Sequence, residues 1–182
     1  MKKISTEQRR ARLAVRHHLV QPVGDVVSAA TAMVGLHSSD PVTVYLSEWA
    51  RVPGFDRGDL AAALYDDRTL LRMLGMRRTM FVVPPDLAAV MQAACTEALL
   101  PPQRRRLLKA LGEQGIATDP EAWLTDVEHK VLQALDAHGE ATASELRESV
   151  PELKEQLAFG EGKAYGGKVG VSTRVLFLLA TA

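Results

Sequence analysis

The stretch Leu36-His37-Ser38-Ser39-Asp40-Pro41 separates two helical patterns of apolar residues and marks the end of one predicted helix and the start of the next. Before it, residues 26–34 carry apolar side chains at helical spacing. Gly35 can end that helix in the left-handed conformation that glycine tolerates best. After it, Asp40 and Pro41 suit the N-cap and the first position of a new helix. The stretch therefore predicts a short extended link between two helices.

The side chains of this link have catalytic potential. In an extended segment His37 and Ser39 point to one face and Ser38 to the other. A neutral His37 can orient or deprotonate a water, and Ser39 can hold that water or a substrate oxygen. The same residues also suit a structural role, with a half-buried histidine, a serine that helps to cap the next helix, and Asp40 as the cap itself. Both interpretations stay open at this point.

Length and composition limit the class of protein. The chain has 182 residues, of which 47% are hydrophobic, and a formal net charge of zero. This composition is typical of a soluble globular protein with one compact domain or two small ones. Zero net charge does not indicate a nucleic-acid partner, so such a partner must be argued from local charges. The lone Cys95 excludes an internal disulfide and, with no visible signal peptide or membrane-length apolar run, fits a cytoplasmic protein.

The first predicted helix is the most one-sidedly basic part of the chain. Ser5-Thr6-Glu7-Gln8 has capping-box spacing and begins a helix that runs to about Leu19. One side of it carries Arg9, Arg10, Arg12 and Arg16, and Lys2 and Lys3 precede it. Such a face can lie along a phosphate backbone or can simply be solvated.

Helices followed by a hairpin are predicted next. Helices are expected over residues 25–34, 41–52 and 56–64, the second with an inward face of Val42, Tyr45, Leu46, Trp49 and Ala50. Residues 70–76 and 79–83 have strand character on either side of Arg77-Arg78, which predicts a β-hairpin. Residues 36–38 can add a third strand, which would bring Arg72 or Arg77 near His37. Otherwise Arg77 and Arg78 are ordinary turn charges.

Further helices are predicted in the C-terminal part of the chain. Asp119-Pro120-Glu121 marks a new start, so we expect domains at 1–117 and 118–182. Arg104-Arg105-Arg106 in a helix's first turn hints at an offsetting anion. Residues 159–170 are predicted to form a long glycine-rich loop, after which Ser172 caps a helix that presents Thr173 and Arg174 as a recognition helix would. The chain stops where a wing should follow, so we expect a fragment or a unit completed by another segment.

Several of these segments resemble the winged-helix DNA-binding proteins related to the bacterial DNA glycosylases AlkZ and YcaQ. The similarity is carried by Arg12-Leu13-Ala14, Gly35 to Pro41, Leu70-Leu71-Arg72, Met76 to Pro84 and Ser172-Thr173-Arg174. It implies a mainly α fold with a short β-hairpin, built as tandem winged-helix units. It further implies double-stranded DNA as the partner, no cofactor, and excision of alkylated or crosslinked bases in DNA repair.

The resemblance also implies roles for individual residues. Family members carry a Gln-x-Gln or Gln-x-Asp catalytic motif where this chain has His37-Ser38-Ser39, so both outer positions differ. His37 would place or deprotonate a water near C1′, Ser39 would hold it, and Asp40 would stabilise a sugar cation unless it is used as a cap. The residues implied in DNA contact are Arg72, Arg77, Arg78, Ser172, Thr173 and Arg174.

Two other classes of function stay open. One is a regulatory winged-helix protein that binds DNA without catalysis. The other is a protein-interaction module, which the neutral net charge favours. The histidines and Cys95 lack a convincing metal-ligand spacing, and neither a P-loop nor a dinucleotide fingerprint is present.

Overall fold

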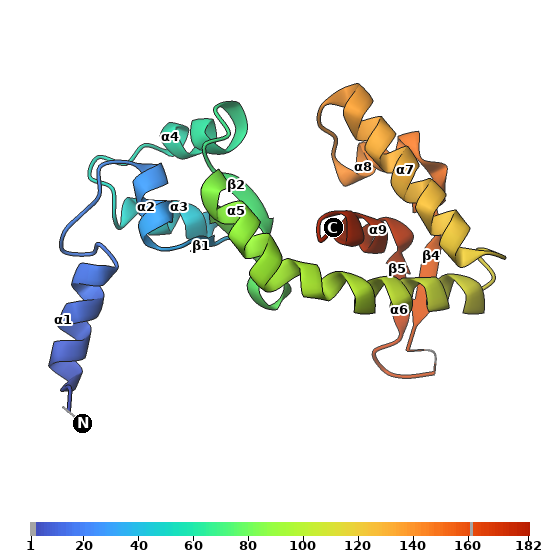
Figure 1. Ribbon diagram of the computed structural model, residues 1–182, viewed down its shortest axis with the longest axis horizontal. Helices are drawn as coiled ribbons and strands as arrows, with labels where there is room; N and C mark the ends of the chain where they lie inside the picture. The colour runs from blue at the N-terminus through green and yellow to red at the C-terminus, as the bar shows by residue number, and fades with distance from the viewer. Residues whose placement is uncertain (1–2, 161) are drawn as a thin grey trace. The chain divides into compact units, whose positions relative to one another are not determined.

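The computed structural model describes residues 3–160 and 162–182 of the chain (Figure 1). It is mainly helical with two small antiparallel sheets, which confirms the predicted fold class at this level. The chain divides into two compact units, Met1–Thr96 and Glu97–Ala182. Within the described residues, no helix combines the length and apolar character that crossing a membrane requires.

The first unit contains short helices around a three-stranded sheet. Its elements are, in chain order, α1 (Thr6–Arg16), α2 (Val26–Ala32), β1 (Leu36–His37), α3 (Pro41–Trp49), α4 (Arg57–Ala61) with the π-helical turn η1 (Ala62–Asp66), β2 (Leu71–Leu74), the 3₁₀ turn η2 (Met76–Arg78), β3 (Met80–Val83), α5 (Pro85–Met91), and the turns η3 (Gln92–Thr96) and η4 (Glu97–Leu99), the last of which begins the second unit.

The sheet has the strand order β1-β3-β2, with both pairs antiparallel. Leu36 lies opposite Val82, and His37 lies opposite Phe81, which in turn lies opposite Met73. This register confirms the predicted hairpin and the predicted third strand beside it. It also assigns each side chain to a face, because directly paired residues of an antiparallel sheet point to the same side.

The two faces of this sheet are covered by different helices. Leu36 and Val82 face a core formed with α2, α3, α4 and η1, whose buried members are Val26, Ala30, Leu36, Val44, Leu60, Ala63, Leu70 and Val82. Phe81 and Val83 face the opposite side and pack on Met91 of α5, which lies over β2 in Figure 1. Gly75 permits this close packing, because a Cβ there would lie 2.8 Å from both Met91 Sδ and Phe81 Cδ2.

The inward face predicted for α3 is wrong. Val42, Leu46 and Trp49 are 60%, 59% and 71% exposed, and the helix buries Val44 and Glu48 instead. Apolar residues cover more than one side of this helix, so periodicity alone could not select the buried side. The pairing of β1 with β3 orients the helix that follows it.

The end of α2 also differs from the prediction, since Val34 takes the left-handed conformation at φ 65° and Gly35 lies at φ 138°.

The second unit is a helical cluster with one hairpin. Its elements are α6 (Leu100–Glu113), α7 (Pro120–His138), α8 (Ala143–Ser149), the 3₁₀ turn η5 (Pro151–Lys154), β4 (Gln156–Phe159), β5 (Gly167–Gly170) and α9 (Val171–Leu179). Leu107 and Leu111 of α6 share a core with α7 and α9. The structure thus groups α6 with the second unit, whereas the sequence analysis placed it before a boundary at residues 117 and 118.

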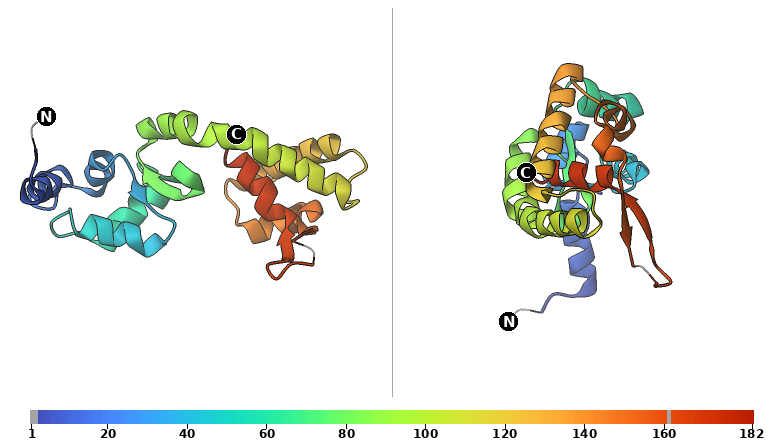
Figure 2. Two further views of the ribbon diagram at one scale, coloured as in Figure 1. Left: turned by 90° about the horizontal axis from the view of Figure 1, so that it is seen from below. Right: turned by 90° about the vertical axis from the view of Figure 1, so that its right-hand side faces the viewer.

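Two predictions in this unit need correction. The expected loop over residues 159–170 contains part of a hairpin, in which Phe159 pairs with Gly167 and Gln156 with Gly170 (Figure 2). Because β5 is glycine-rich, it shows no apolar alternation that would indicate a strand. Ser172 is not the cap of α9. The N-cap is Gly170, and Ser172 is buried inside the first turn because β5 runs directly into the helix.

One arginine of the cluster at residues 104–106 is paired with carboxylates of α7. The helix begins at Leu100, so Arg104 lies beyond its first turn. Arg104 forms ion pairs of 2.8 Å with Glu121 and with Glu128 of α7. These carboxylates raise the pKa of Arg104 further above its ordinary value, chiefly through the hydrogen bond with Glu128. The charge of Arg104 is therefore offset within the chain, whereas Arg105 and Arg106 are exposed.

Candidate functional site

The link between β1 and α3 is held as an extended edge of the sheet. The Ser38 amide donates to the Met80 carbonyl at 2.8 Å, and the Met80 amide donates to Ser39 Oγ at 3.3 Å. Asp40 is the N-cap of α3, with its Oδ1 accepting from the Val42 amide at 3.0 Å. The link is thus anchored to β3 on one side and to α3 on the other. Such anchoring limits how far its side chains can move.

His37 and Ser39 are the exposed residues of this edge. Leu36 and Ser38 alternate with them and are buried, as expected for an extended segment. The His37 ring stands edge-on to Phe81, with ring centroids 5.5 Å apart and planes at 87°. Ser39 Oγ accepts from the Met80 amide, so its hydroxyl proton can be donated outward. A donor or acceptor nitrogen and a hydroxyl are therefore presented together on a rigid strand edge.

Arg72 reaches this link from the opposite face of the sheet. Arg72 belongs to β2 and pairs with Val82 of β3. Its side chain therefore shares a face of the sheet with Leu36 and Ser38 rather than with His37. Its Nη2 and Nε donate to the Ser38 carbonyl at 2.9 and 3.3 Å, and its Nε also lies 3.3 Å from Ser38 Oγ. Ser38 is fully buried. The guanidinium group therefore clamps the backbone of the link and does not edge a groove beside the imidazole.

Arg77 and Arg78 form the tip of the hairpin in an unusual conformation. Their φ angles are 54° and 64°, and the Thr79 amide donates to the Met76 carbonyl at 3.2 Å across the turn. Two consecutive left-handed residues are the geometry of a type I′ turn, which normally selects Asn-Gly. The left-handed conformation costs a residue with a Cβ roughly 1–2 kcal/mol. The tip thus carries two strained arginines where a more stable pair was available.

This strain leads to a prediction. The double variant Arg77→Asn and Arg78→Gly is expected to raise the free energy of unfolding by about 1–2 kcal/mol, because both new residues suit the left-handed region. Thermal unfolding followed by circular dichroism measures the change. The single variant Gly54→Ala is the control with opposite sign, since Gly54 has φ 68° and open space around it. A double variant less stable than the parent would contradict the assignment of strain.

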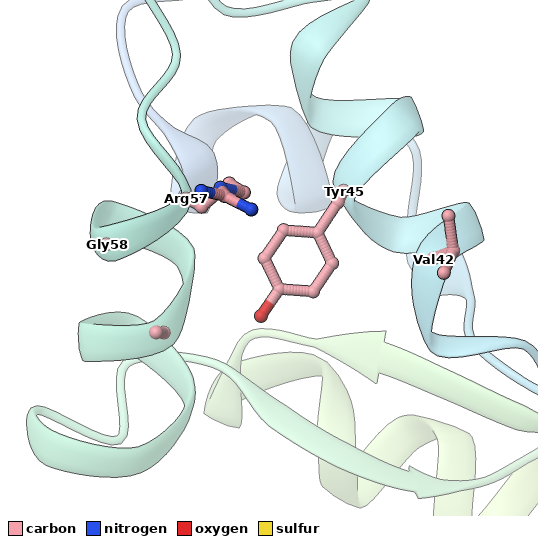
Figure 3. Close-up of a pocket in the computed structure, with 5 residues that line it drawn as sticks. Val42, Tyr45, Arg57 and Gly58 are labelled. Carbon is pink, nitrogen blue, oxygen red and sulfur yellow. The ribbon is translucent and has the colours of Figure 1, made fainter.

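A pocket that the sequence did not indicate lies between α3 and α4. Its volume is about 580 Å³, and its lining residues are Val42, Tyr45, Arg57, Gly58 and Ala61. Tyr45 projects from α3 into the space and Arg57 lies on the α4 side of it (Figure 3). Tyr45 is half-buried and packs against the core of the first unit, whereas Val42, predicted to face inward, is exposed and not in the core. A tyrosine hydroxyl and a guanidinium group at its wall can both donate to a phosphate oxygen.

Glu48 is a buried carboxyl that was not among the predicted site residues. It is fully buried, and neither of its oxygens has a hydrogen-bond partner among the residues that the structure describes. Burial raises the pKa of Glu48 to about 8, while Arg51 acts in the opposite direction and Asp25 adds a smaller upward contribution. The pKa of Asp25 is itself lowered, because the Ser28 amide and hydroxyl donate to its carboxylate. The signal was available, since Glu48 lies midway between the buried Val44 and Val52 at helical spacing.

The residues predicted at the start of α9 belong to the second unit. Thr173 and Arg174 are exposed, and Ser172 is 5% exposed. Ser172 therefore packs inside the unit, whereas its two neighbours remain available to a partner. Over residues 3–160 and 162–182 we find no group of three or more His, Cys, Asp or Glu side chains that could hold a metal ion.

Comparisons with known proteins identify the family. Neither a curated protein nor a solved structure matches the chain. The model of the family described as DNA glycosylase AlkZ-like matches residues 30–182, which include the link, the hairpin and the whole second unit. Arg12-Leu13-Ala14 lies outside the matched region. The match covers most of the chain, and the protein therefore belongs to the AlkZ-like DNA glycosylase family.

Proposed function

We propose that this chain binds double-stranded DNA and hydrolyses the N-glycosidic bond of an alkylated base. The observation that supports this best is the pair of exposed side chains, His37 and Ser39, on the edge of the sheet. Arg72 fixes the backbone between them through a hydrogen bond to the Ser38 carbonyl. The family to which the chain belongs is named for DNA glycosylases. The edge supplies the polar groups that such a reaction requires, on a segment that is fixed at both ends.

The order of elements in the first unit supports a winged helix. Helix α2, strand β1, helices α3 and α4, and the hairpin β2–β3 follow one another, with β1 beside β3. In this arrangement α3 and α4 form the helix-turn-helix, and the hairpin tip with Arg77 is the wing. Arg57 and Tyr65 are exposed on α4 and η1, where the second helix of such a unit faces DNA. The second unit also contains three helices and a hairpin, but its hairpin β4–β5 lies between α8 and α9, with Thr173 and Arg174 at the start of α9.

The proposed reaction requires little acid assistance. An N7- or N3-alkylated purine is cationic, so the bond between C1′ and the base nitrogen breaks with both electrons moving to a neutral leaving base. The sugar becomes an oxocarbenium-like cation, and a water oxygen adds to C1′. His37 accepts the proton of that water, and the Ser39 hydroxyl donates a hydrogen bond to its oxygen. The products are a free alkylated base and an abasic site.

Arg72 is a positioning residue in this proposal. Its guanidinium group holds the Ser38 carbonyl between the two exposed side chains, at 2.9 Å from Nη2. The spacing of His37 and Ser39 is set by this backbone. A change of geometry at this peptide would therefore alter the reaction without any direct contact of Arg72 with the substrate.

A second candidate function is DNA binding without catalysis. Its support is Asp40, whose carboxylate caps α3 through the Val42 amide and is thus engaged in structure rather than aimed at a sugar. In addition, the outer positions of the implied family motif hold His37 and Ser39 rather than glutamine. In this case the two winged helices would only position the chain on a duplex.

One experiment on the full chain separates these functions. A fluorescein-labelled duplex with a single 7-methylguanine is titrated for anisotropy, and the same samples are treated with alkali to cleave abasic strands. Binding with strand cleavage supports the glycosylase. Binding without cleavage supports the second candidate, and the absence of binding at 50 mM salt would overturn both.

A further inference from the structure

Helix α1 stands apart from the rest of the chain in its chemistry. It has a complete capping box, in which the Gln8 amide donates to Ser5 Oγ and the Ser5 amide donates to the Gln8 side chain, each at 3.1 Å. Yet the helix contains no buried residue. It also precedes residues 30–182, the part that matches the family. The helix is thus specified by its own sequence, and packing against the core does not account for it.

Residues 1–29 carry a net positive charge, in contrast to the rest of the chain. Residues 1–29 contain six of the 22 Lys and Arg residues but only two of the 22 Asp and Glu residues, so their formal charge is +4. Because the whole chain is neutral, residues 30–182 carry −4. A net negative domain is repelled by a phosphate backbone at long range. The segment before residue 30 compensates for this.

Three arginines of α1 are arranged as a row. Arg9, Arg12 and Arg16 follow the i, i+3, i+7 spacing that puts residues on one side of a helix. At a rise of 1.5 Å per residue the row spans about 10 Å, a length over which a nucleic-acid strand presents successive phosphates. Arg9, Arg12 and Arg16 are exposed, and form no ion pair within the part of the chain that the structure describes.

We infer that α1 is a phosphate-binding helix that anchors this chain on duplex DNA. The inference rests on the proposed DNA-binding function and adds the element that supplies its electrostatic affinity. The unpaired row of guanidinium groups is complementary to a polyanion. Residues 1–29 carry the excess of cations, whereas residues 30–182 have more acidic than basic residues. The contacts are to phosphates, so they contribute affinity without sequence preference.

The test compares two charge-matched triple variants of the full chain. The first changes Arg9, Arg12 and Arg16 to Gln, and the second changes Lys109, Arg147 and Lys154 to Gln. The affinity for an unmodified duplex is measured by anisotropy between 50 and 200 mM salt. We expect the first variant to lose about tenfold or more in affinity at 50 mM salt and to reduce the slope of log K against log salt by about 3. The second variant should keep both within experimental error.

Each other outcome overturns the inference in a distinguishable way. Equal affinity and slope for the parent and the α1 variant would exclude α1 from DNA contact while leaving the proposed function intact. Absence of duplex binding by the parent would remove the proposed function itself. Binding of the parent to vesicles with 30% anionic lipid, lost in the α1 variant while duplex affinity is unchanged, would assign the row to a membrane surface. Because α1 buries no residue, the variant should unfold at the parent's temperature.

Discussion

Replacement of Glu48 with Gln is expected to remove most of the pH dependence of stability of the first unit between pH 4.5 and 8. Glu48 is fully buried and its carboxyl has no hydrogen-bond partner in the described part of the chain, and burial raises its pKa from 4.5 to about 8. The folded chain therefore holds this proton more tightly than the unfolded chain. The resulting stability is complete below pH 4.5 and is lost as the pH rises towards 8. Over this pH range the free energy of unfolding of the parent should fall by an amount on the order of 4 kcal/mol.

The measurement needs a signal from the first unit alone. Trp49 of α3 and Trp123 of α7 are the two tryptophans of the chain, so a Trp123→Phe background leaves Trp49 as the reporter. Urea unfolding followed by its fluorescence is compared at pH 5 and pH 8 with and without Glu48→Gln. Glu155→Gln serves as the control, because Glu155 is exposed. A parent as stable at pH 8 as at pH 5 would show that Glu48 is not held neutral by burial.

The second large effect is expected at His37. The His37→Ala variant should release an alkylated base at least about 100-fold more slowly than the parent, the usual contribution of a proton acceptor in the transition state. Its duplex affinity should change less than twofold, because the imidazole contacts Phe81 and solvent rather than the arginines of the hairpin. Release is followed under single-turnover conditions with protein in excess. His129→Ala is the matched control, since His129 is exposed in the second unit and bonds to Gln133.

Further variants of the link divide its roles. Arg72→Met should slow base release because the Ser38 peptide is misplaced. The rate of release at saturation should fall, and the affinity for the duplex should be retained.

The double variant His37→Gln and Ser39→Gln installs the glutamine motif that the family resemblance implies. It should release base at least as fast as the parent if the edge is the catalytic position. A double variant as inactive as His37→Ala would place the reaction elsewhere.

Much of the first unit could be predicted because its signals are local. Asp40-Pro41 and Ser5 to Gln8 specify helix starts through hydrogen bonds within a few residues, and both caps are present. The extended pattern of the link indicated that His37 and Ser39 share one face and that Ser38 lies on the other. These features depend on neighbours in sequence, and therefore appear in the pattern without knowledge of the fold.

The remaining features depend on contacts between distant segments. The side on which α3 is buried follows from its place against β1 and α2, so Glu48 was overlooked and Trp49 was assigned to the core. The face that Arg72 occupies is set by its register opposite Val82, which proximity in the sequence could not reveal. The triple arginine at residues 104–106 hints at an offsetting anion, and α7 supplies Glu121 and Glu128 for Arg104. In each case the tertiary partner decided the role of the residue.

Chromatographic detection of free 7-methylguanine is the most direct test of the central claim. The full 182-residue chain is incubated in excess with a duplex that contains one such base, and the base is separated from the DNA at intervals. We expect first-order release of one base per duplex, slowed at least about 100-fold in a parallel sample of the His37→Ala variant. Binding of the duplex by the parent with no free base above the spontaneous rate would contradict it.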